Sequence, residues 1–418
     1  MTVTTDKARA GTFADPRDLR AAWSVAAVFL LNGLTFAVWS SRIPTIKQTL
    51  GLTAGELGLI LFIGSIGSLI SLPTAGRVVM RIGASRTVWA GVAGAISGLV
   101  LLGVAVGVYQ SPILVAVALF ALGFGNGLWD VAMNLEGAAV EHSSGRVIMP
   151  RFHAAFSGGT VLSALVTALL LRMDVGIVPQ TLVAAVLIPI LMVFALRGFL
   201  PRTAEEGAGE TAVDEAATSS ERGRSGSAWL EPRTLLIGVV VLVAALTEGT
   251  ANDWVSVAFV EGHHLPAWAG VLAFATFLTA MTIGRLVGPA ILERHGRVAT
   301  LRVLFVLAGI GSLLVVFGSP AVAYAGAVLW GLGASLGFPV GMSAAADEPA
   351  RAAARMSVVS TIGYTAFLTG PTVLGFLGDH VGVLHSLLLV GGLALVALAL
   401  VPATREPARR TEVAPEGV

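Results

Sequence analysis

Three polar side chains recur every four residues within an otherwise apolar stretch from Leu122 to Gly137. Asn126, Asp130 and Asn134 bring two amides and one carboxyl group into this stretch. At 3.6 residues per helical turn, the spacing places all three on one stripe of a helix. A carboxylate facing lipid is costly, so the stripe predicts a helix face directed at an ion or substrate path.

Asp130 is the leading candidate for a proton carrier. A carboxyl group in a cavity of low dielectric can gain and lose a proton as its access to either side changes. Its charge would then bias the direction in which the protein opens. The alternative is that Asp130 pairs with a basic residue and only holds two helices together.

The composition describes a membrane protein with many spans. Of 418 residues, 55% are hydrophobic and only 12% are charged, and 50 glycines suit close packing of membrane helices. The chain has no cysteine, which excludes disulfides, thiolate metal sites and cysteine nucleophiles. We expect no metal and no cofactor.

Long apolar runs predict twelve spans, because about 20 residues cross a bilayer. The first six occupy 21–41, 57–76, 87–129, 152–171 and 175–196. The second six occupy 234–260, 267–290, 303–346, 356–378 and 381–401. The third run of each set is a double span, divided by turn residues at 109–112 and 318–320. The predicted fold class is an all-α membrane protein of two six-helix bundles.

A polar stretch rich in Glu, Ala, Gly, Ser and Arg separates the two sets and cannot bury a core. We therefore expect a tail at 1–20, a bundle at 21–200, a linker at 201–233, a second bundle at 234–402 and a tail at 403–418. Because residues 1–20 are polar and show no small-residue cleavage site ahead of an apolar core, we expect no cleavable signal peptide before the first span.

The basic residues predict the orientation. With a cytoplasmic N-terminus, the outer loops hold only Arg42, Lys47 and Arg172, in agreement with the positive-inside rule. Both termini and the linker would then be cytoplasmic, in a bacterial plasma membrane.

The two halves also share sequence features. RFHAAFSGGT at 151–160 and RMSVVSTIGYT at 355–365 both open a fifth span with arginine, and MRIGASR at 80–86 has a counterpart in ERHGRVA at 293–299. Internal repeats of this kind are typical of secondary transporters.

The twelve spans in two sets of six, the central linker and the two loops resemble the major facilitator superfamily across the ordered chain. Within that resemblance, GRVVMRIGASR at 76–86 is similar to the family's loop signature. The resemblance implies a charge network that closes the inner side. Met80 stands where the family has an acid, whereas the second copy keeps Glu293, Arg294 and Gly296. It therefore implies that Glu293 and Arg294 belong to the inner gate.

AspValAlaMetAsn at 130–134, followed by an arginine-led fifth span, resembles the fucose/proton symporter branch and related bacterial inner-membrane proteins of unassigned substrate. This resemblance implies proton coupling at Asp130 and a sugar path near Asn134. The branch carries an acid on its first span, but this chain has Asn32 and no acid between Ala21 and Ser41. A second protonation site is therefore expected elsewhere.

The seventh span supplies acids that could fill this role. Glu248 shares a helix face with Asn252, and Asp253 follows near the outer end. We expect Glu248 to support proton coupling and Asn252 to line the substrate cavity. Arg42 at the end of the first span could meet Asp253 or Glu248 as an outer gate, or could simply extend to the membrane interface.

At the inner end of the fifth span, Arg151 and His153 could pair with Asp130 or Glu136 as gate charges. His153 could instead be a packing residue. Neither alternative is preferred by the sequence.

The remaining cavity candidates are polar or aromatic. Asn32, Thr35 and Trp39 form a stripe on the first span that suits a hydroxylated ligand. Tyr364 and Phe367, with Trp39 and Trp254, could stack on a ligand, although aromatics near span ends often serve as interfacial anchors.

These features favour a secondary active transporter that carries a small sugar-like or other polar solute by proton symport. Export of drugs or metabolites by proton antiport is the alternative, although 157–163 lacks the Gly-Pro signature of drug antiporters and GlyProThr occurs only at 370–372. A membrane receptor that does not transport is a third possibility. No phosphate loop, zinc spacing or nucleophile elbow suggests an enzyme. We expect a monomer in lipid, with a small molecule and protons as partners and no nucleic acid.

Overall fold

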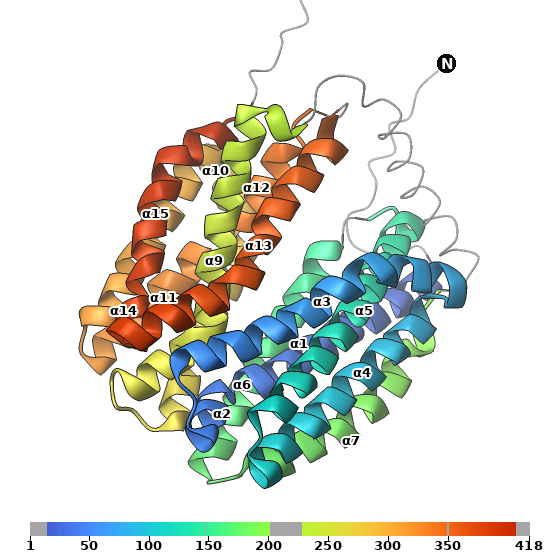
Figure 1. The fold of residues 1–418 in the computed structure, drawn as a ribbon. Coiled ribbons are helices and arrows are strands. Elements are labelled where there is room, and N and C mark those ends of the chain that lie inside the picture. Colours follow the sequence, from blue (N-terminus) through green and yellow to red (C-terminus); the bar gives the residue numbers. More distant parts are fainter. Residues whose placement is uncertain (1–14, 147, 201–227, 349–350, 407–418) are drawn as a thin grey trace, which may run out of the picture. The chain divides into compact units, whose positions relative to one another are not determined.

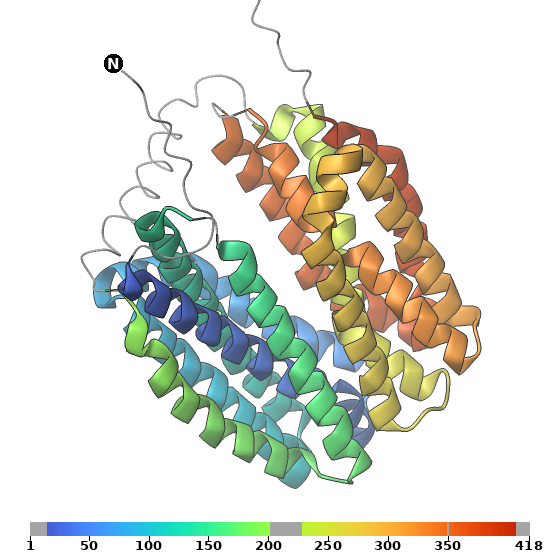
Figure 2. The same ribbon diagram turned by 180° about the vertical axis from the view of Figure 1, so that it is seen from behind.

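The computed structural model describes residues 15–146, 148–200, 228–348 and 351–406, and every regular element in these ranges is helical. Contacts divide the chain into two compact units, Met1–Trp39 with Ile63–Val213 and Ser40–Phe62 with Asp214–Val418. Within each unit the long helices run side by side (Figures 1 and 2). The predicted all-α architecture is confirmed.

Proline or glycine stands at many of the helix ends. Up to residue 200 the helices are α1 (Pro16–Ser40), α2 (Ile43–Leu50), α3 (Ala54–Ile82), α4 (Ala84–Val104), η1 (Ala105–Tyr109), α5 (Pro112–Ser144), α6 (Met149–Arg172), α7 (Ile177–Ala195) and η2 (Leu196–Gly198). From residue 228 they are η3 (Ala228–Leu230), α9 (Pro232–Glu261), α10 (Ala267–Phe317), α11 (Pro320–Ala334), α12 (Gly337–Ala345), α13 (Ala352–Val381), α14 (Val383–Ser386), α15 (Leu388–Leu400) and η5 (Val401–Thr404).

The helices of the described residues account for twelve spans. Among the described residues, eleven helices are long and apolar enough to cross a membrane. One of the eleven, α10, has 51 residues and contains Gly296 in a non-helical conformation, with φ 75° and ψ 167°. Because Gly296 ends one helix and starts the next, α10 comprises spans eight and nine.

Both predicted breaks inside the double runs are confirmed. The π-helical η1 ends at Tyr109 and α5 begins at Pro112, while α10 ends at Phe317 and α11 begins at Pro320. The fourth span extends beyond the uncharged run that indicated it. The uncharged run ends at Trp129, but α5 continues to Ser144, so the polar stripe lies at the middle of a helix.

The ends of the predicted domains fall partly on residues 1–14, 201–227 and 407–418, which lie outside the described residues. α9 begins at Pro232, inside the predicted linker 201–233. η5 runs to Thr404, beyond the predicted end of the second bundle at 402.

The loops after the second and eighth spans share one backbone conformation. Gly83 has φ 86° and ψ 160°, close to the angles of Gly296. Side chains other than glycine rarely adopt a positive φ, so both copies of the loop require glycine at this point. The repeated sequence therefore produces a repeated turn.

Glycines also bring the third and fourth spans of each unit into backbone contact. A Cβ atom on Gly125 of α5 would lie 2.3 Å from the nitrogen of Ala95 on α4. A Cβ atom on Gly333 of α11 would lie 2.4 Å from the nitrogen of Ala308 on α10. Gly125 immediately precedes Asn126, so this contact fixes the helix that carries the polar stripe.

Candidate functional site

The polar stripe of α5 forms as the sequence predicts. Asn126, Asp130 and Asn134 are all half-buried. Asn134 Nδ2 donates to Asp130 Oδ1 over 3.3 Å and to the carbonyl oxygen of Asp130 over 2.8 Å. The four-residue spacing thus brings an amide onto the carboxyl group.

Asp130 forms no ion pair with any described residue of the chain. Its side-chain partner is the neutral amide of Asn134, and Trp129 beside it is fully buried in the core. Among the described residues, Asp130 therefore does not join two helices through a salt bridge, which was the alternative interpretation of this acid.

The predicted stripe on α1 separates into three different environments. Asn32 is fully buried, and neither polar atom of its amide has a hydrogen-bond partner among the described residues. Thr35 is also buried, but its Oγ1 donates to Leu31 O over 2.7 Å, which uses its hydroxyl within the helix. Trp39 is half-buried and packs edge-on against Phe36 at 5.6 Å.

In the second unit, Glu248 of α9 pairs with an arginine that the sequence did not single out. Arg285 of α10 places Nη2 at 2.8 Å from Glu248 Oε2. Glu248 therefore does not form the predicted outer-gate pair with Arg42, whose side chain is buried at 1% exposure. A single arginine inside the apolar run 267–290 was the signal that could have identified Arg285.

The same arginine, Arg285, contacts a break in the tenth span. α11 ends at Ala334 and α12 begins at Gly337. Proline has no N–H, so Pro339 cannot donate to the carbonyl four residues earlier, which belongs to Ser335. Arg285 Nε donates to that oxygen over 3.2 Å. The guanidinium therefore links the broken helix to Glu248.

The other predicted groups of α9 lack such partners. Asn252 Oδ1 is buried without a hydrogen bond among the described residues. Asp253 is half-buried and forms no ion pair within the described part of the chain. Trp254 is fully buried, so the predicted stacking of a ligand on its ring was wrong.

An aromatic cluster lies on α12 and α13. The ring centroids of Phe338 and Tyr364 are 6.0 Å apart, and those of Tyr364 and Phe367 are 6.4 Å apart. Tyr364 is 45% exposed. The two predicted stacking residues of α13 are thus neighbours.

At the predicted outer end of the second unit, two further acidic residues form polar contacts. Lys47 Nζ lies 2.6 Å from Glu261 Oε1. Asp379 accepts hydrogen bonds from the backbone nitrogens of Ala54 and Gly55 over 2.7 and 3.0 Å. A carboxylate at the N-terminus of α3 satisfies two free N–H groups and complements the helix dipole.

Of the predicted inner-gate residues, Glu293 and Arg294 take no part in the charge network that described residues of the second unit form. Glu293 and Arg294 have exposed side chains. In the first unit, Arg151 and His153 are both exposed, and the His153 ring lies edge-on to Phe29 with their centroids 5.2 Å apart.

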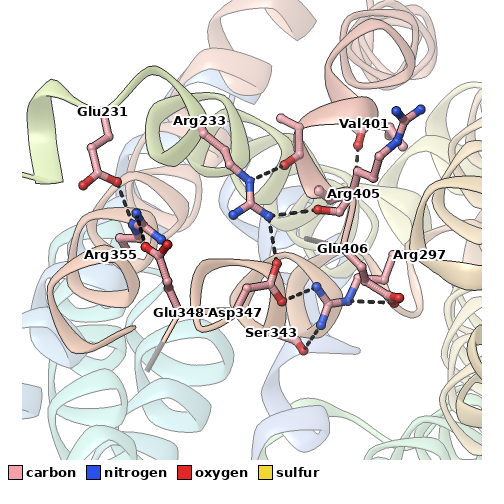
Figure 3. A network of polar contacts seen from close by, with 12 residues as sticks. Glu231, Arg233, Arg297, Ser343, Asp347, Glu348, Arg355, Val401, Arg405 and Glu406 are labelled. Atoms are coloured by element: carbon pink, nitrogen blue, oxygen red, sulfur yellow. Dashed lines mark hydrogen bonds and ion pairs between the residues drawn. The ribbon is translucent and has the colours of Figure 1, made fainter. Parts of the chain in front are cut away.

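The network itself joins the ends of α9, α12 and α13 with the chain after Gly296 (Figure 3). Asp347 binds Arg233 and Arg297 over 2.8 and 2.5 Å. Glu231 binds Arg351 and Arg355 over 2.5 and 2.6 Å. The sequence predicted none of these pairs, although Arg355 opens the repeated segment 355–365 and Arg297 lies in the repeated loop 293–299.

The charges around Glu231 set its protonation. Burial by itself raises the pKa of Glu231, but hydrogen bonds from Thr234 and Arg355 and the charges of Arg355 and Arg351 outweigh burial. The pKa of Glu231 is therefore held below its ordinary value of 4.5. Within the described ranges, no three His, Asp or Glu side chains come together as a metal site.

Comparison with known proteins agrees with this architecture. A solved nucleoside transporter, NupG, superimposes with a TM-score of 0.71 at 15% identity, over 91% of this chain and 98% of that protein. An uncharacterised MFS-type transporter of Yersinia pestis is 30% identical over 93% of this chain and 95% of its own length. An uncharacterised transporter of Sinorhizobium fredii is 31% identical over 93% of this chain and 100% of its own length.

The family model of the Major Facilitator Superfamily matches residues 25–348 and, in a second match, residues 269–417. Together these matches cover both units, including the repeated loops at Gly83 and Gly296. The chain therefore belongs to the major facilitator superfamily and is a multi-pass membrane transporter.

Proposed function

We propose that this transporter carries a small polar, sugar-like solute across a bacterial plasma membrane by proton symport with alternating access. The observation that carries the proposal is Asp130, a carboxyl group within a membrane span whose described partner is an amide and not a cation. A proton is then the simplest means of neutralising its charge. Asn126 and Asn134 on the same stripe can hydrogen-bond a hydroxylated solute.

In the second unit we assign the supporting protonation site to Asp253 in place of Glu248. Glu248 is already neutralised by Arg285 at 2.8 Å, whereas Asp253 has no ion pair among the described residues. The transporter would be a monomer with both termini in the cytoplasm, as the basic residues of the loops favour.

The test uses purified protein in liposomes that contain a pH dye, with sugars and then amphiphilic drugs added outside. Symport carries protons inward with the ligand and acidifies the lumen. We expect wild type to do so with one ligand class and Asp130→Asn to fall to the level of empty liposomes. Asp174→Asn, which changes an exposed acid outside the spans, should behave as wild type.

Other outcomes would point elsewhere. Proton movement by Asp130→Asn equal to that of wild type would refute the role of Asp130. Alkalinisation of the lumen would indicate antiport and support the exporter. Ligand binding by wild type without proton or ligand flux would indicate a receptor.

A further inference from the structure

Arg285 keeps unused hydrogen-bond donors inside the membrane spans. Arginine has five N–H groups, of which Nε–H reaches Ser335 O and one on Nη2 reaches Glu248. Three N–H groups remain without a described partner. The side chains of Arg285 and Glu248 are 32% and 18% exposed. A charged pair facing lipid is costly, so the accessible edge of this pair must face a path for polar molecules.

Aromatic side chains lie near both Ser335 and Glu248, the two residues that Arg285 contacts. Phe338 lies three residues after Ser335, and its ring is 6.0 Å from Tyr364. At the other end, a Cβ atom on Gly249, next to Glu248, would lie 3.4 Å from Phe367 Cδ1. The rings of Tyr364 and Phe367 complete the connection. An accessible ion pair thus lies beside an accessible aromatic face.

The local charge selects the kind of ligand that fits. Arg285 and Glu248 neutralise each other, so the pair carries no net positive charge that would attract an anionic ligand. Two neighbouring hydroxyl groups fit better, because they can accept from a guanidinium and donate to a carboxylate at once.

We propose that Arg285 and Glu248 bind two neighbouring hydroxyl groups of a neutral ring compound whose apolar face rests on Tyr364. The inference rests on the proposed function, because it names the substrate class of the same transporter. The Ser335 carbonyl, freed by Pro339, holds the guanidinium in place for this contact. Arg285 is then a residue that determines specificity.

The test measures binding by titration calorimetry to the full-length protein in detergent. The neutral probes are myo-inositol, L-fucose and uridine, and the matched probes are 2′,3′-dideoxyuridine, which lacks the diol, and glucuronate, which adds a carboxylate. We expect at least one neutral diol to bind more tightly than glucuronate, and uridine, if bound, to exceed its dideoxy form. Arg285→Gln removes hydrogen bonds from a charged group and Tyr364→Ala removes the aromatic face, and each change should weaken binding by at least about tenfold.

A second variant separates ligand binding from a merely structural ion pair. Arg285→Gln combined with Glu248→Gln leaves no unpaired charge, so its melting temperature should stay near that of wild type. The same double variant should lose diol binding. Arg302→Gln, which changes an exposed arginine of α10 beyond the break at Gly296, should bind as wild type does.

The proposal is overturned if the double variant binds the diol as tightly as wild type, if glucuronate is preferred, or if no neutral diol binds. Liposome uptake distinguishes this failure from failure of the proposed function. A diol that binds through Arg285 but is never accumulated with protons would refute symport and keep the site. A diol that is accumulated with protons equally by wild type and the double variant would refute the site and keep symport.

Discussion

Asn32 is the polar residue whose environment is least typical of a folded core. Its amide is fully buried, and both polar atoms lack partners among the described residues. A buried polar group without a hydrogen bond costs about 1–3 kcal/mol. We expect Asn32→Leu to raise the free energy of unfolding by about 1 kcal/mol and to lower solute uptake, as measured by melting in detergent and by liposome transport.

Thr35→Val is the matched control for this prediction. Thr35 lies on the same helix and is equally buried, but its hydroxyl already has a partner in Leu31. Its replacement should therefore not stabilise the protein. A lower melting temperature for Asn32→Leu than for wild type would show that the amide is satisfied in the membrane.

Glu231 makes the stability of the second unit depend on pH. Its pKa in the folded protein lies below the ordinary value of 4.5, so the stabilisation is fully present above pH 4.5. It is lost as the pH falls through the lowered pKa. We expect Glu231→Gln to be less stable than wild type at neutral pH and to lose less stability on acidification, in melting scans from pH 7 downward.

Glu293→Gln provides the comparison, because Glu293 is an exposed acid just before the break at Gly296 in α10. This variant should follow wild type throughout the scan. Equal acid sensitivity of Glu231→Gln and wild type would mean that other carboxyl groups control the transition.

Residues that share one helix were the easiest to predict. The spacing of Asn126, Asp130 and Asn134 follows from helical geometry alone, so the sequence is sufficient to place them together. The pairing of Glu248 with Arg285 joins two helices, and the sequence contains no signal for which basic residue an acid will meet. Arg42 was expected there because of its position at a span end, whereas Arg285 was hidden in an apolar run.

At the level of helices, Gly125 sets the distance between α4 and α5. A Cβ atom there would lie 2.3 Å from a backbone nitrogen, which cannot move without shifting the helix. We expect Gly125→Ala to destabilise the protein by about 1–3 kcal/mol, as for other overpacked sites, in a melting measurement. It should also impair transport, because it displaces Asn126.

Gly158 on α6 offers a matched control within a helix. A Cβ atom on Gly158 would meet nothing within 4 Å. Since alanine favours helix more than glycine does, Gly158→Ala should be neutral or slightly stabilising. Equal melting of the two variants would refute the argument from close packing.

The breaks between helices were predictable to different degrees. Pro112 and Pro320 follow turn residues, so the breaks inside both double runs were visible in the sequence. The gap between α11 and α12 was not, because Pro339 acts on a carbonyl four residues earlier inside an apolar stretch. Whether such a proline bends, breaks or leaves a helix intact depends on whether a neighbouring helix supplies a donor, here Arg285.

For the whole molecule, twelve spans and a repeated turn at Gly83 and Gly296 could be derived from hydropathy and repetition. The network at Asp347 and Glu231 could not, because Glu231 and Arg355 are distant in sequence and meet only after the bundle has formed. Hydropathy identifies spans but does not determine which loop charges pair.

The absence of cysteine allows a direct test of the proposed orientation. Ser319 lies between spans nine and ten, and His295 lies between spans eight and nine. In intact cells, we expect a membrane-impermeant maleimide to label Ser319→Cys and to leave His295→Cys unlabelled until the membrane is opened. The opposite pattern would place both termini outside, and the unsubstituted chain provides the unlabelled control.

The charge network around Asp347 also has a practical consequence for handling the protein. Arg233 donates to the carbonyl oxygens of Ala403 and Arg405, and Arg297 lies 3.6 Å from Glu406. The segment just after the last span is therefore fastened to the bundle. Affinity tags and fluorescent fusions should be joined beyond residue 406, since a shorter fusion point would remove acceptors from two arginines and expose the purified protein to proteolysis and aggregation.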